Sequence, residues 1–331
     1  MEHGSRLAHL LESAAARDRI RLKWTSDGVR QLEKTPRGSM APADATRLFQ
    51  HEVSCAIHVA ELVNRHGQRF APQVFSADEQ HLRLEFYESA TMLSDSALWA
   101  SKSRPLAETA RALGSSLSVL HASAGVSRSA RLERVPTGPI AVTDLPMVSA
   151  GQVEFLSRIH CEDDIARAYN ATMDAACVPQ AFIHGDLKPD NVLVRDDQVI
   201  LVDWESAGTG RPEADFASLL GGLLFGSVCA AVAPGERSIN ADLDTRSTAV
   251  FAFVAETIAN YETSTSLDFE LLVRLTGCSL MSRITGLIAH TYSWDRTAEV
   301  SWRISRMLIR APQEAMRRLT RQSWRADAVP R

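Results

Sequence analysis

Apolar and polar residues alternate with two different periods in the N-terminal part of this 331-residue chain. Runs at residues 20–25 and 29–34 alternate residue by residue around a Ser-Asp-Gly turn signal, and a second pair of such runs lies within residues 71–88. Period-two alternation on both sides of a turn is typical of a β-hairpin. In residues 5–17 and 47–66, apolar residues instead recur every three or four positions, as in amphipathic helices. We therefore predict two hairpins, with one helix before the first and one helix between the two.

The remainder of the chain carries mostly the helical spacing. The segments that show it are residues 106–121, 151–176, 216–232 and 242–322. A sheet-rich part followed by a larger helical part is the pattern of an α+β protein. The sequence therefore predicts a first unit at residues 1–88, which includes the N-terminal helix, and a second, helical unit at residues 89–331.

One segment, residues 182–205, combines short apolar runs with side chains that carry oxygen atoms. Its polar loop contains Asp186 and ends at Asn191, and two β-branched runs then enclose a charged turn and lead to Asp203. Because two such runs form a hairpin, we expect these three side chains to lie close together at its ends. Oxygen ligands without a compensating cation favour Mg²⁺, which commonly accompanies phosphates. The segment therefore predicts phosphoryl transfer, although any one of the three side chains would also serve as a turn cap.

Composition and charge argue against several classes of protein. Hydrophobic residues make up 45% of the chain, enough for a sizeable core, and the formal net charge of -4 gives no global attraction to nucleic acid or to an anionic membrane. The five cysteines are odd in number and include no C-x-x-C pair, which argues against a disulfide framework or a zinc site. The N-terminus lacks the apolar core of a secretory signal, and we expect no segment to reach the length of a membrane span. These features predict a cytoplasmic protein that binds neither nucleic acid nor membrane.

The C-terminal region is basic, with tryptophans between its arginines. Such a segment can grip nucleic acid, phosphates or an acidic peptide, but exposed arginines more often form a solvated helix face, which is our interpretation here. The residues concerned are Trp302, Arg303, Arg306, Arg310, Arg317, Arg318, Arg321, Trp324 and Arg325.

The sequence HGDLKPDN at residues 184–191, followed by Asp203-Trp204-Glu205, resembles the signature of the aminoglycoside phosphotransferase and choline-kinase-like family. That family has the two-lobed protein-kinase fold, with a small, mostly β N-lobe and a larger, mostly helical C-lobe. The resemblance implies a kinase that uses ATP and Mg²⁺. It implies that Asp186 orients the acceptor hydroxyl or accepts its proton, and that Lys188 stabilises the γ-phosphoryl group. Asn191 and Asp203 would then hold Mg²⁺ on the nucleotide phosphates.

The same resemblance implies nucleotide-binding residues in the N-lobe. Lys34 resembles the strand lysine that holds the phosphates, and Glu52, on the following predicted helix, resembles its acidic partner. The alternative is that both are solvated surface charges. Tyr87 and Glu88 are expected in the hinge, whose backbone groups face the adenine. The chain departs from the family at residues 5–27, which contain no glycine where members often carry a glycine-bearing loop over the phosphates.

Two further residues are expected to hold the catalytic loop in place. His184 more plausibly braces it through a ring hydrogen bond than acts as a second base. Asp215 resembles the acid that binds the backbone of this loop in the kinase fold, and it is also a candidate N-cap for the next helix.

The sequence leaves the acceptor open between two classes. Residues 125–180 form an insertion before the catalytic loop, and in the family such an insertion commonly shapes the acceptor side. Lys188 and the segment at residues 203–215 resemble enzymes that act on Ser or Thr, including phosphotransferases that prepare natural-product precursor peptides for elimination. A polycationic aminoglycoside is the alternative, and it would need an acidic pocket, for which the candidates are Glu205, Glu213, Asp215 and the acidic run at residues 162–164.

The expected partners are therefore a peptide or small-molecule hydroxyl acceptor and, for a peptide, a second enzyme of the same pathway. A third hypothesis is a pseudokinase that keeps the fold without turnover, because the glycine loop is missing. The presence of Asp186, Lys188, Asn191 and Asp203 argues against it. Consumption of Mg·ATP in the presence of an acceptor would discriminate between an active kinase and a pseudokinase.

Overall fold

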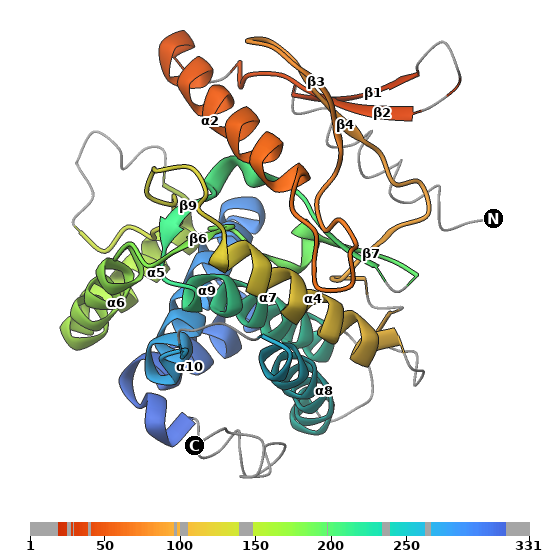
Figure 1. Cartoon of the computed structure of the whole chain (residues 1–331). Coiled ribbons are helices and arrows are strands. Elements are labelled where there is room, and N and C mark those ends of the chain that lie inside the picture. Colours follow the sequence, from red (N-terminus) through yellow and green to blue (C-terminus); the bar gives the residue numbers. More distant parts are fainter. Residues whose placement is uncertain are drawn as a thin grey trace.

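The computed structural model places a smaller, sheet-rich part of the chain above a larger helical part (Figure 1). The helix predicted at residues 5–17 lies outside the residues that the structure describes. The described residues are 19–24, 28, 30–38, 41–95, 98–99, 105–138, 148–196, 198–233, 239–261 and 266–315.

The sheet-rich part contains a four-stranded antiparallel sheet with the strand order β1-β2-β4-β3. Both predicted hairpins are present in it. The strands are β1 (Ile20–Trp24), β2 (Arg30–Lys34), β3 (Val74–Ala77) and β4 (Leu82–Glu85). Lys34 pairs with Ile20 on one side and with Leu82 on the other, so it occupies the end of a central strand.

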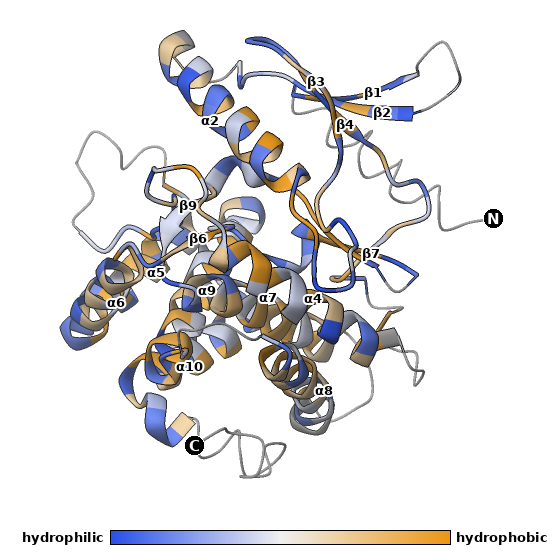
Figure 2. Cartoon of the chain, in the orientation of Figure 1, coloured by the Kyte–Doolittle hydropathy of each residue, from blue (hydrophilic) through white to orange (hydrophobic). Residues whose placement is uncertain are grey.

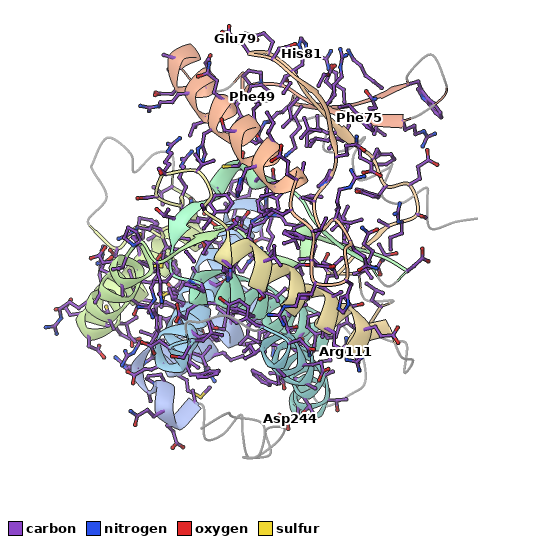
Figure 3. All side chains as sticks on the ribbon, in the orientation of Figure 1. Phe49, Phe75, Glu79, His81, Arg111 and Asp244 are labelled. Atoms are coloured by element: carbon purple, nitrogen blue, oxygen red, sulfur yellow. The ribbon has the colours of Figure 1, made fainter. Side chains whose placement is uncertain are left out.

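Helix α2 (Pro42–Ala60) packs its apolar face on this sheet. A proline in the first turn suits a helix start, because its missing N–H would have no partner there. Phe49, labelled in Figure 3, is 2% exposed and packs in a cluster with Ala56, Leu82 and Leu84. This packing fixes the helix that carries Glu52 against the strand that carries Lys34.

The helical part is built around α7, α8, α9 and α10, with α4, α5 and α6 beside them (Figure 2). The segment predicted as one helix at residues 151–176 is two helices, which meet at Cys161 and Glu162. The bounds are α4 (Pro105–Ala122), α5 (Ala150–His160), α6 (Asp163–Ala176), α7 (Glu213–Val232), α8 (Ile239–Ala259), α9 (Phe269–Thr291) and α10 (Arg296–Arg310).

Helices α7 and α9 are long and apolar enough to cross a membrane by length and composition alone. The expectation that no segment reaches that length is therefore wrong. In the structure 61% of each apolar window is buried, and the two helices pack against each other. Their apolar character is thus accounted for by packing in the core of the helical part.

Short strands join the two parts and carry the catalytic segment. Strand β5 (Thr91–Met92) pairs with β7, β7 pairs with β8, and β6 pairs with β9. The bounds are β6 (Ala181–Ile183), β7 (Val192–Arg195), β8 (Gln198–Leu201) and β9 (Gly208–Gly210), with single 3-10 turns at η2 (Pro189–Asn191) and η3 (Trp204–Ser206). Gly208 allows a close approach of chains, since a Cβ there would lie 2.3 Å from the carbonyl oxygen of Arg128.

Candidate active site

The hairpin β7-β8 brings the predicted catalytic segment together. Asp186 lies on the loop after β6, Asn191 ends η2 just before β7, and Asp203 follows β8. The amide nitrogen of Asn191 donates to the backbone oxygen of Asp186 at 2.8 Å and lies 3.3 Å from its carboxylate oxygen Oδ2. The predicted juxtaposition of Asp186 and Asn191 is therefore present.

Asp215 holds the backbone of the catalytic loop. Its carboxylate, which is fully buried, accepts hydrogen bonds from the backbone N–H groups of His184 at 2.8 Å and Gly185 at 2.9 Å. The ring of His121 lies 3.0 Å from the same carboxylate. Burial alone would raise the pKa of Asp215, but the hydrogen bond and charge of His121 lower it overall. The N-cap of α7 is Pro212, so the bracing prediction for Asp215 is confirmed and the N-cap alternative is not adopted.

The ring of His184 braces the same loop. One ring nitrogen lies 3.0 Å from the backbone oxygen of Val202, and the other accepts the backbone N–H of Asp186 at 3.4 Å. The ring also packs on Trp204, with the centroids 4.5 Å apart. Gly185, with φ +78°, is required here because a Cβ would meet the backbone oxygen of Ser206 at 2.3 Å. The bracing contact expected of His184 is therefore present.

Lys34 connects the sheet to both α2 and the catalytic segment. Its Nζ lies 2.8 Å from Oε1 of Glu52 and 2.7 Å from Oδ1 of Asp203. The ion pair predicted between Lys34 and Glu52 is present and its side chains are 5% and 2% exposed, which rules out two solvated surface charges. Burial alone would raise the pKa of Asp203, but Lys34, and then Lys188, lower it. Asp203 is thus held as a carboxylate.

Arg19 is a site residue that sequence reasoning missed. From the residue before β1, its guanidinium contacts Glu52 and also lies 2.5 Å from Oε2 of Glu205, and its Nε donates to the backbone oxygen of Thr35 at 3.1 Å. Arg37 binds the other carboxylate oxygen of Glu205 at 2.6 Å. A basic residue at the start of a strand carries no motif, so the sequence offered no signal for this network.

A cavity of about 210 Å³ lies between the sheet and the hairpin β7-β8. Apolar residues from both parts of the chain form most of its wall, as expected for a site that encloses a flat base. Its lining residues include Ile20, Leu32, Lys34, Glu52, Ala56, Leu84, Glu85, Phe86, Tyr87, Met92, Asn191, Leu193, Val202 and Asp203. The cavity therefore unites the residues expected to bind nucleotide with those expected to bind metal.

The predicted hinge lines this cavity only in part. Tyr87 is buried in the wall and donates its hydroxyl hydrogen to Glu85 at 2.8 Å, and burial raises the pKa of its phenol. Glu88 is not among the lining residues, and its exposed side chain lies 3.2 Å from Arg30. Glu85 and Phe86 line the cavity instead, so the stretch facing it begins earlier in the chain than predicted.

The oxygen atoms in this cavity fit a hard divalent cation. Because the amide nitrogen of Asn191 is directed to Asp186, the amide oxygen of Asn191 is left as an acceptor, and Asn191 and Asp203 both line this cavity. Within the described part of the chain, no group of three or more His, Cys, Asp or Glu side chains could hold a metal alone. A cation here would thus complete its shell with phosphate oxygens and water, as Mg²⁺ does at nucleotide sites.

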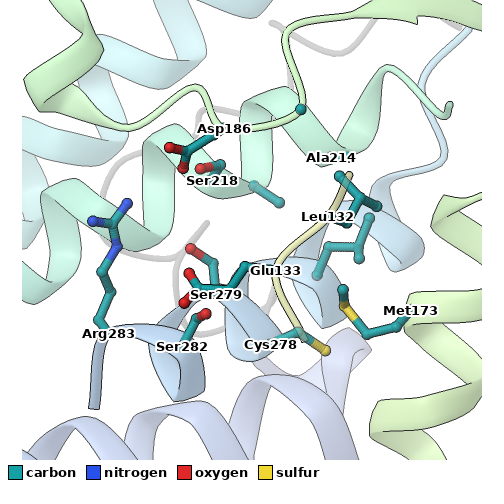
Figure 4. A pocket seen from close by; sticks show the side chains of 13 residues that line it. Leu132, Glu133, Met173, Asp186, Ala214, Ser218, Cys278, Ser279, Ser282 and Arg283 are labelled. Atoms are coloured by element: carbon teal, nitrogen blue, oxygen red, sulfur yellow. The ribbon is translucent and has the colours of Figure 1, made fainter. Parts of the chain in front are cut away.

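Two further cavities meet at Asp186. The larger, of about 530 Å³, is lined by parts of α2, by residues 131–134 and by the loop itself. The smaller, of about 60 Å³, lies between the loop, α7 and α9 and is lined by Ser218, Ser279 and Arg283, among others (Figure 4). Both cavities include Gly185 and Asp186 in their walls. We call them the acceptor-side cavities, because they contain Asp186, the residue expected to meet the acceptor, and share no lining residue with the cavity beside Lys34.

The acidic run proposed for an aminoglycoside pocket lies elsewhere. Glu162 lies 2.7 Å from Arg306 and 2.9 Å from Arg310, and Asp164 lies 2.6 Å from Arg310. None of residues 162–164 lines either acceptor-side cavity. Glu205 does line the larger cavity, but two arginines bind it. The convergence of Glu205 and the acids at residues 162–164 on Asp186, which would favour the aminoglycoside alternative, does not occur.

The described C-terminal arginines are committed to ion pairs on the helix surface. Arg306 and Arg310 bind the acids that precede and begin α6, and Arg303 lies 2.7 Å from Glu299 within α10. The arginines at positions 317, 318, 321 and 325 and Trp324 lie outside the described residues.

Comparison with known proteins identifies the family. A model described as the phosphotransferase enzyme family (APH) matches residues 9–246, which is more than half of the chain. The chain belongs to this family and is a phosphotransferase, and the family implies ATP as the phosphoryl donor. No curated protein matches the chain in sequence.

Solved structures that are similar to this chain include several kinases. A glucosamine kinase in complex with glucosamine, ADP and inorganic phosphate is 14% identical, over 94% of this chain and 87% of its own, with a TM-score of 0.52. A macrolide 2'-phosphotransferase from Brachybacterium faecium is 17% identical, over 92% and 98% of the two chains, with a TM-score of 0.42. A choline kinase from Streptococcus pneumoniae is 12% identical, over 92% and 99%, with a TM-score of 0.47. At these identities, the glucosamine kinase match establishes the kinase-like α+β fold alone.

Proposed function

We propose that this protein transfers the γ-phosphoryl group of ATP to a Ser or Thr hydroxyl of a precursor peptide. The observation that carries the proposal is the arrangement of the two acceptor-side cavities, which meet at Asp186. An extended peptide advances about 3.3 Å per residue and must continue beyond the reacting hydroxyl in both directions. Two cavities that meet at Asp186 suit such a chain better than one closed pocket would.

Asp186 and Lys188 are our candidates for the catalytic pair. Asp186 would orient the acceptor hydroxyl or accept its proton, and Nζ of Lys188 lies 2.8 Å from the same carboxylate. Burial alone would lower the pKa of Lys188, but the charge of Asp186 and the hydrogen bond to it raise the pKa. Lys188 therefore stays protonated at neutral pH and can neutralise charge on the group in transfer.

Lys34, Glu52, Asn191 and Asp203 are assigned to the nucleotide. Lys34 would bind the phosphates while Glu52 fixes its ammonium group, and Asn191 and Asp203 would hold Mg²⁺. Bound there, Mg²⁺ supplies charge neutralisation and orientation of the phosphate oxygens. The apolar wall around Tyr87 would accept the adenine. Backbone hydrogen bonding by Glu88 stays a prediction.

The charge of the larger cavity disfavours the aminoglycoside alternative. Burying a polycation requires several unpaired carboxylates, because each uncompensated charge is costly to desolvate. The acids on the wall are Glu133, Asp186 and Glu205, and the last two are already paired with cations. Gentamicin and similar polyamines are therefore expected to be poor acceptors.

Two further parts of the proposal concern the cellular setting. A phosphorylated Ser or Thr is a substrate for elimination, so we propose a partner enzyme that removes the phosphate to give a dehydro residue.

We also propose a cytoplasmic location, which is supported by the five free cysteines, since a reducing compartment keeps thiols unpaired.

Mass spectrometry of candidate acceptors would test the proposal. The protein is incubated with Mg·ATP and either Ser- and Thr-containing peptides or gentamicin, and the products are searched for the mass gain of one phosphoryl group. Phosphorylation of a peptide that disappears in the Asp186→Asn variant supports the function. Phosphorylation of gentamicin alone would establish the aminoglycoside alternative, and intact nucleotide binding with no turnover of any acceptor would favour the pseudokinase.

A further inference from the structure

The larger acceptor-side cavity has an excess of positive charge. Five cationic and three anionic side chains line it. The cations are Arg19, Arg37, Arg131, Arg134 and Lys188, and the anions are Glu133, Asp186 and Glu205. A cavity lined in this way concentrates anions and repels amines, since wall charges of one sign focus the field inside a cleft.

The cations near the nucleotide are already engaged. Arg19 and Arg37 share Glu205, and Lys188 is paired with Asp186. These three ion pairs fix the end of the cavity that lies next to the catalytic loop. They therefore account for three of the five cations and leave the charges of Arg131 and Arg134 on the same wall to be explained.

Arg131 and Arg134 form the part of the wall that belongs to the segment after α4, where the backbone N–H of Arg131 donates to the backbone oxygen of Ser206 at 3.0 Å. Arg131 makes no ion pair with any residue that the structure describes, and its side chain is exposed to the cavity. Arg134 lies 2.8 Å from Asp174 on α6, but both side chains are largely exposed, at 41% and 71%. A surface pair of this kind contributes little, so a ligand anion can replace Asp174 at small cost.

This wall faces the acceptor and not the nucleotide. Leu132 and Glu133, between the two arginines, line both acceptor-side cavities, whereas no residue of the segment 131–134 lines the nucleotide cavity. A negative charge bound by Arg131 and Arg134 thus belongs to the acceptor. Glu133 is the one anion on the segment, and the two arginines outnumber it.

We propose that the acceptor carries a carboxylate near the reacting hydroxyl and that Arg131, together with Arg134, binds this carboxylate. The inference rests on the proposed peptide kinase function and narrows its substrate to a Ser or Thr flanked by Asp or Glu. Arginine suits the role because its planar guanidinium can bind both oxygens of a carboxylate at once.

Three synthetic peptides of equal length test the proposal. Each contains one Ser, flanked by Asp and Glu in the first, by Ala and Gln in the second, and by Lys and Arg in the third. We expect kcat/KM to be about tenfold higher for the acidic than for the neutral peptide, the size of one charge-assisted hydrogen bond, and lowest for the basic peptide. The preference should shrink as ionic strength rises, because salt screens an exposed contact.

Substitutions of Arg131 and Arg134 test whether these two residues cause the preference for acidic peptides. Arg131→Gln should remove most of the acidic preference while leaving kcat/KM for the neutral peptide and the affinity for Mg·ATP unchanged, and Arg131→Glu should favour the basic peptide. Arg134→Gln should act in the same direction. The matched control is Arg111→Gln, because Arg111 is an exposed arginine on α4, paired with Glu256 and outside both cavities (Figure 3).

The two possible failures are distinguishable. Turnover of the three peptides at equal rates, or an acidic preference that survives Arg131→Glu, would overturn the carboxylate site and leave the peptide kinase in place. Failure to phosphorylate any peptide, with gentamicin phosphorylated instead, would overturn the proposed function and this inference together.

Discussion

The Nζ atom of Lys34 lies 2.7 Å from Oδ1 of Asp203, although 169 residues separate the two in the chain. Lys34 ends strand β2 of the upper sheet, and Asp203 follows strand β8 in the lower part. The contact therefore joins the two parts of the protein through one ammonium group. Because Glu52 binds the same ammonium group, helix α2, the sheet and the catalytic segment share one charge network.

Asp203 should contribute to the binding of Mg·ATP, whereas Asp186 should contribute to turnover. Asp203→Ala removes a carboxylate from the nucleotide cavity and should weaken Mg·ATP binding, measured by calorimetry, by about tenfold or more. Asp186→Ala should leave that affinity nearly unchanged and lower kcat by roughly 10²-fold or more, the usual scale for a positioned acid–base group. Asp244→Ala, at an exposed position of α8 labelled in Figure 3, is the control and should change neither. Near-full turnover in Asp186→Ala would contradict the catalytic assignment.

Glu52 should be important for stability as well as for nucleotide binding. Glu52→Gln removes one of the two carboxylates that bind Lys34, in a site where the side chains of Lys34 and Glu52 are only 5% and 2% exposed. Breaking a buried pair from one side typically costs about 3–5 kcal/mol, so the free energy of unfolding in urea should fall by roughly that amount. Glu61→Gln, at the exposed end of α2, should change it by about 0.5 kcal/mol or less. An equal effect of the two substitutions would exclude a stabilising role for the pair.

The catalytic hairpin and the Lys34–Glu52 pair were predictable because their signals are local. Alternation with a turn identifies a hairpin within about a dozen residues, and the strand-to-helix spacing of the family then indicates which acid meets Lys34. The short pair β6-β9 was missed, since β9 is Gly208-Thr209-Gly210 and has no alternating pattern. The break between α5 and α6 was missed for a similar reason, as neither glycine nor proline marks it.

The partners of charged residues were not predictable. Arg19 meets Glu205 across 186 residues, and Arg310 meets Asp164 across 146. Without knowledge of such distant partners, the run of acids at residues 162–164 suggested a pocket for a cationic substrate. The actual partners of Glu162 and Asp164 are arginines of α10. Tertiary packing decides such pairings, and a single sequence contains no periodic trace of them.

The buried carboxylate of Asp215 should make the free energy of unfolding depend on pH in the acidic range. Its pKa is lowered in the folded protein, where His121 and the loop N–H groups bind the carboxylate. A group with a lowered pKa stabilises the fold fully above its unfolded pKa of about 3.9, and this contribution is lost as the pH falls toward the lower folded value. The free energy of unfolding should therefore decrease below about pH 4 in the wild type. Asp215→Asn should be less stable at neutral pH and should show a shallower decrease, while the exposed Asp244→Asn should follow the wild-type curve.

Arg19 should support nucleotide binding through the carboxylates that it holds. Its guanidinium contacts Glu52, the partner of Lys34, and lies 2.5 Å from Glu205. Arg19→Gln releases one side of Glu52 and should raise the KM for ATP by about tenfold, the scale of one charge-assisted hydrogen bond, with a smaller change in kcat. Arg37→Gln is a matched comparison, because Arg37 also binds Glu205 but its side chain is half exposed and the described structure shows no contact with Glu52. It should raise the KM by about threefold at most, as expected for an exposed pair. Equal effects of the two substitutions would mean that Glu205, and not Glu52, transmits the effect of Arg19 to the nucleotide cavity.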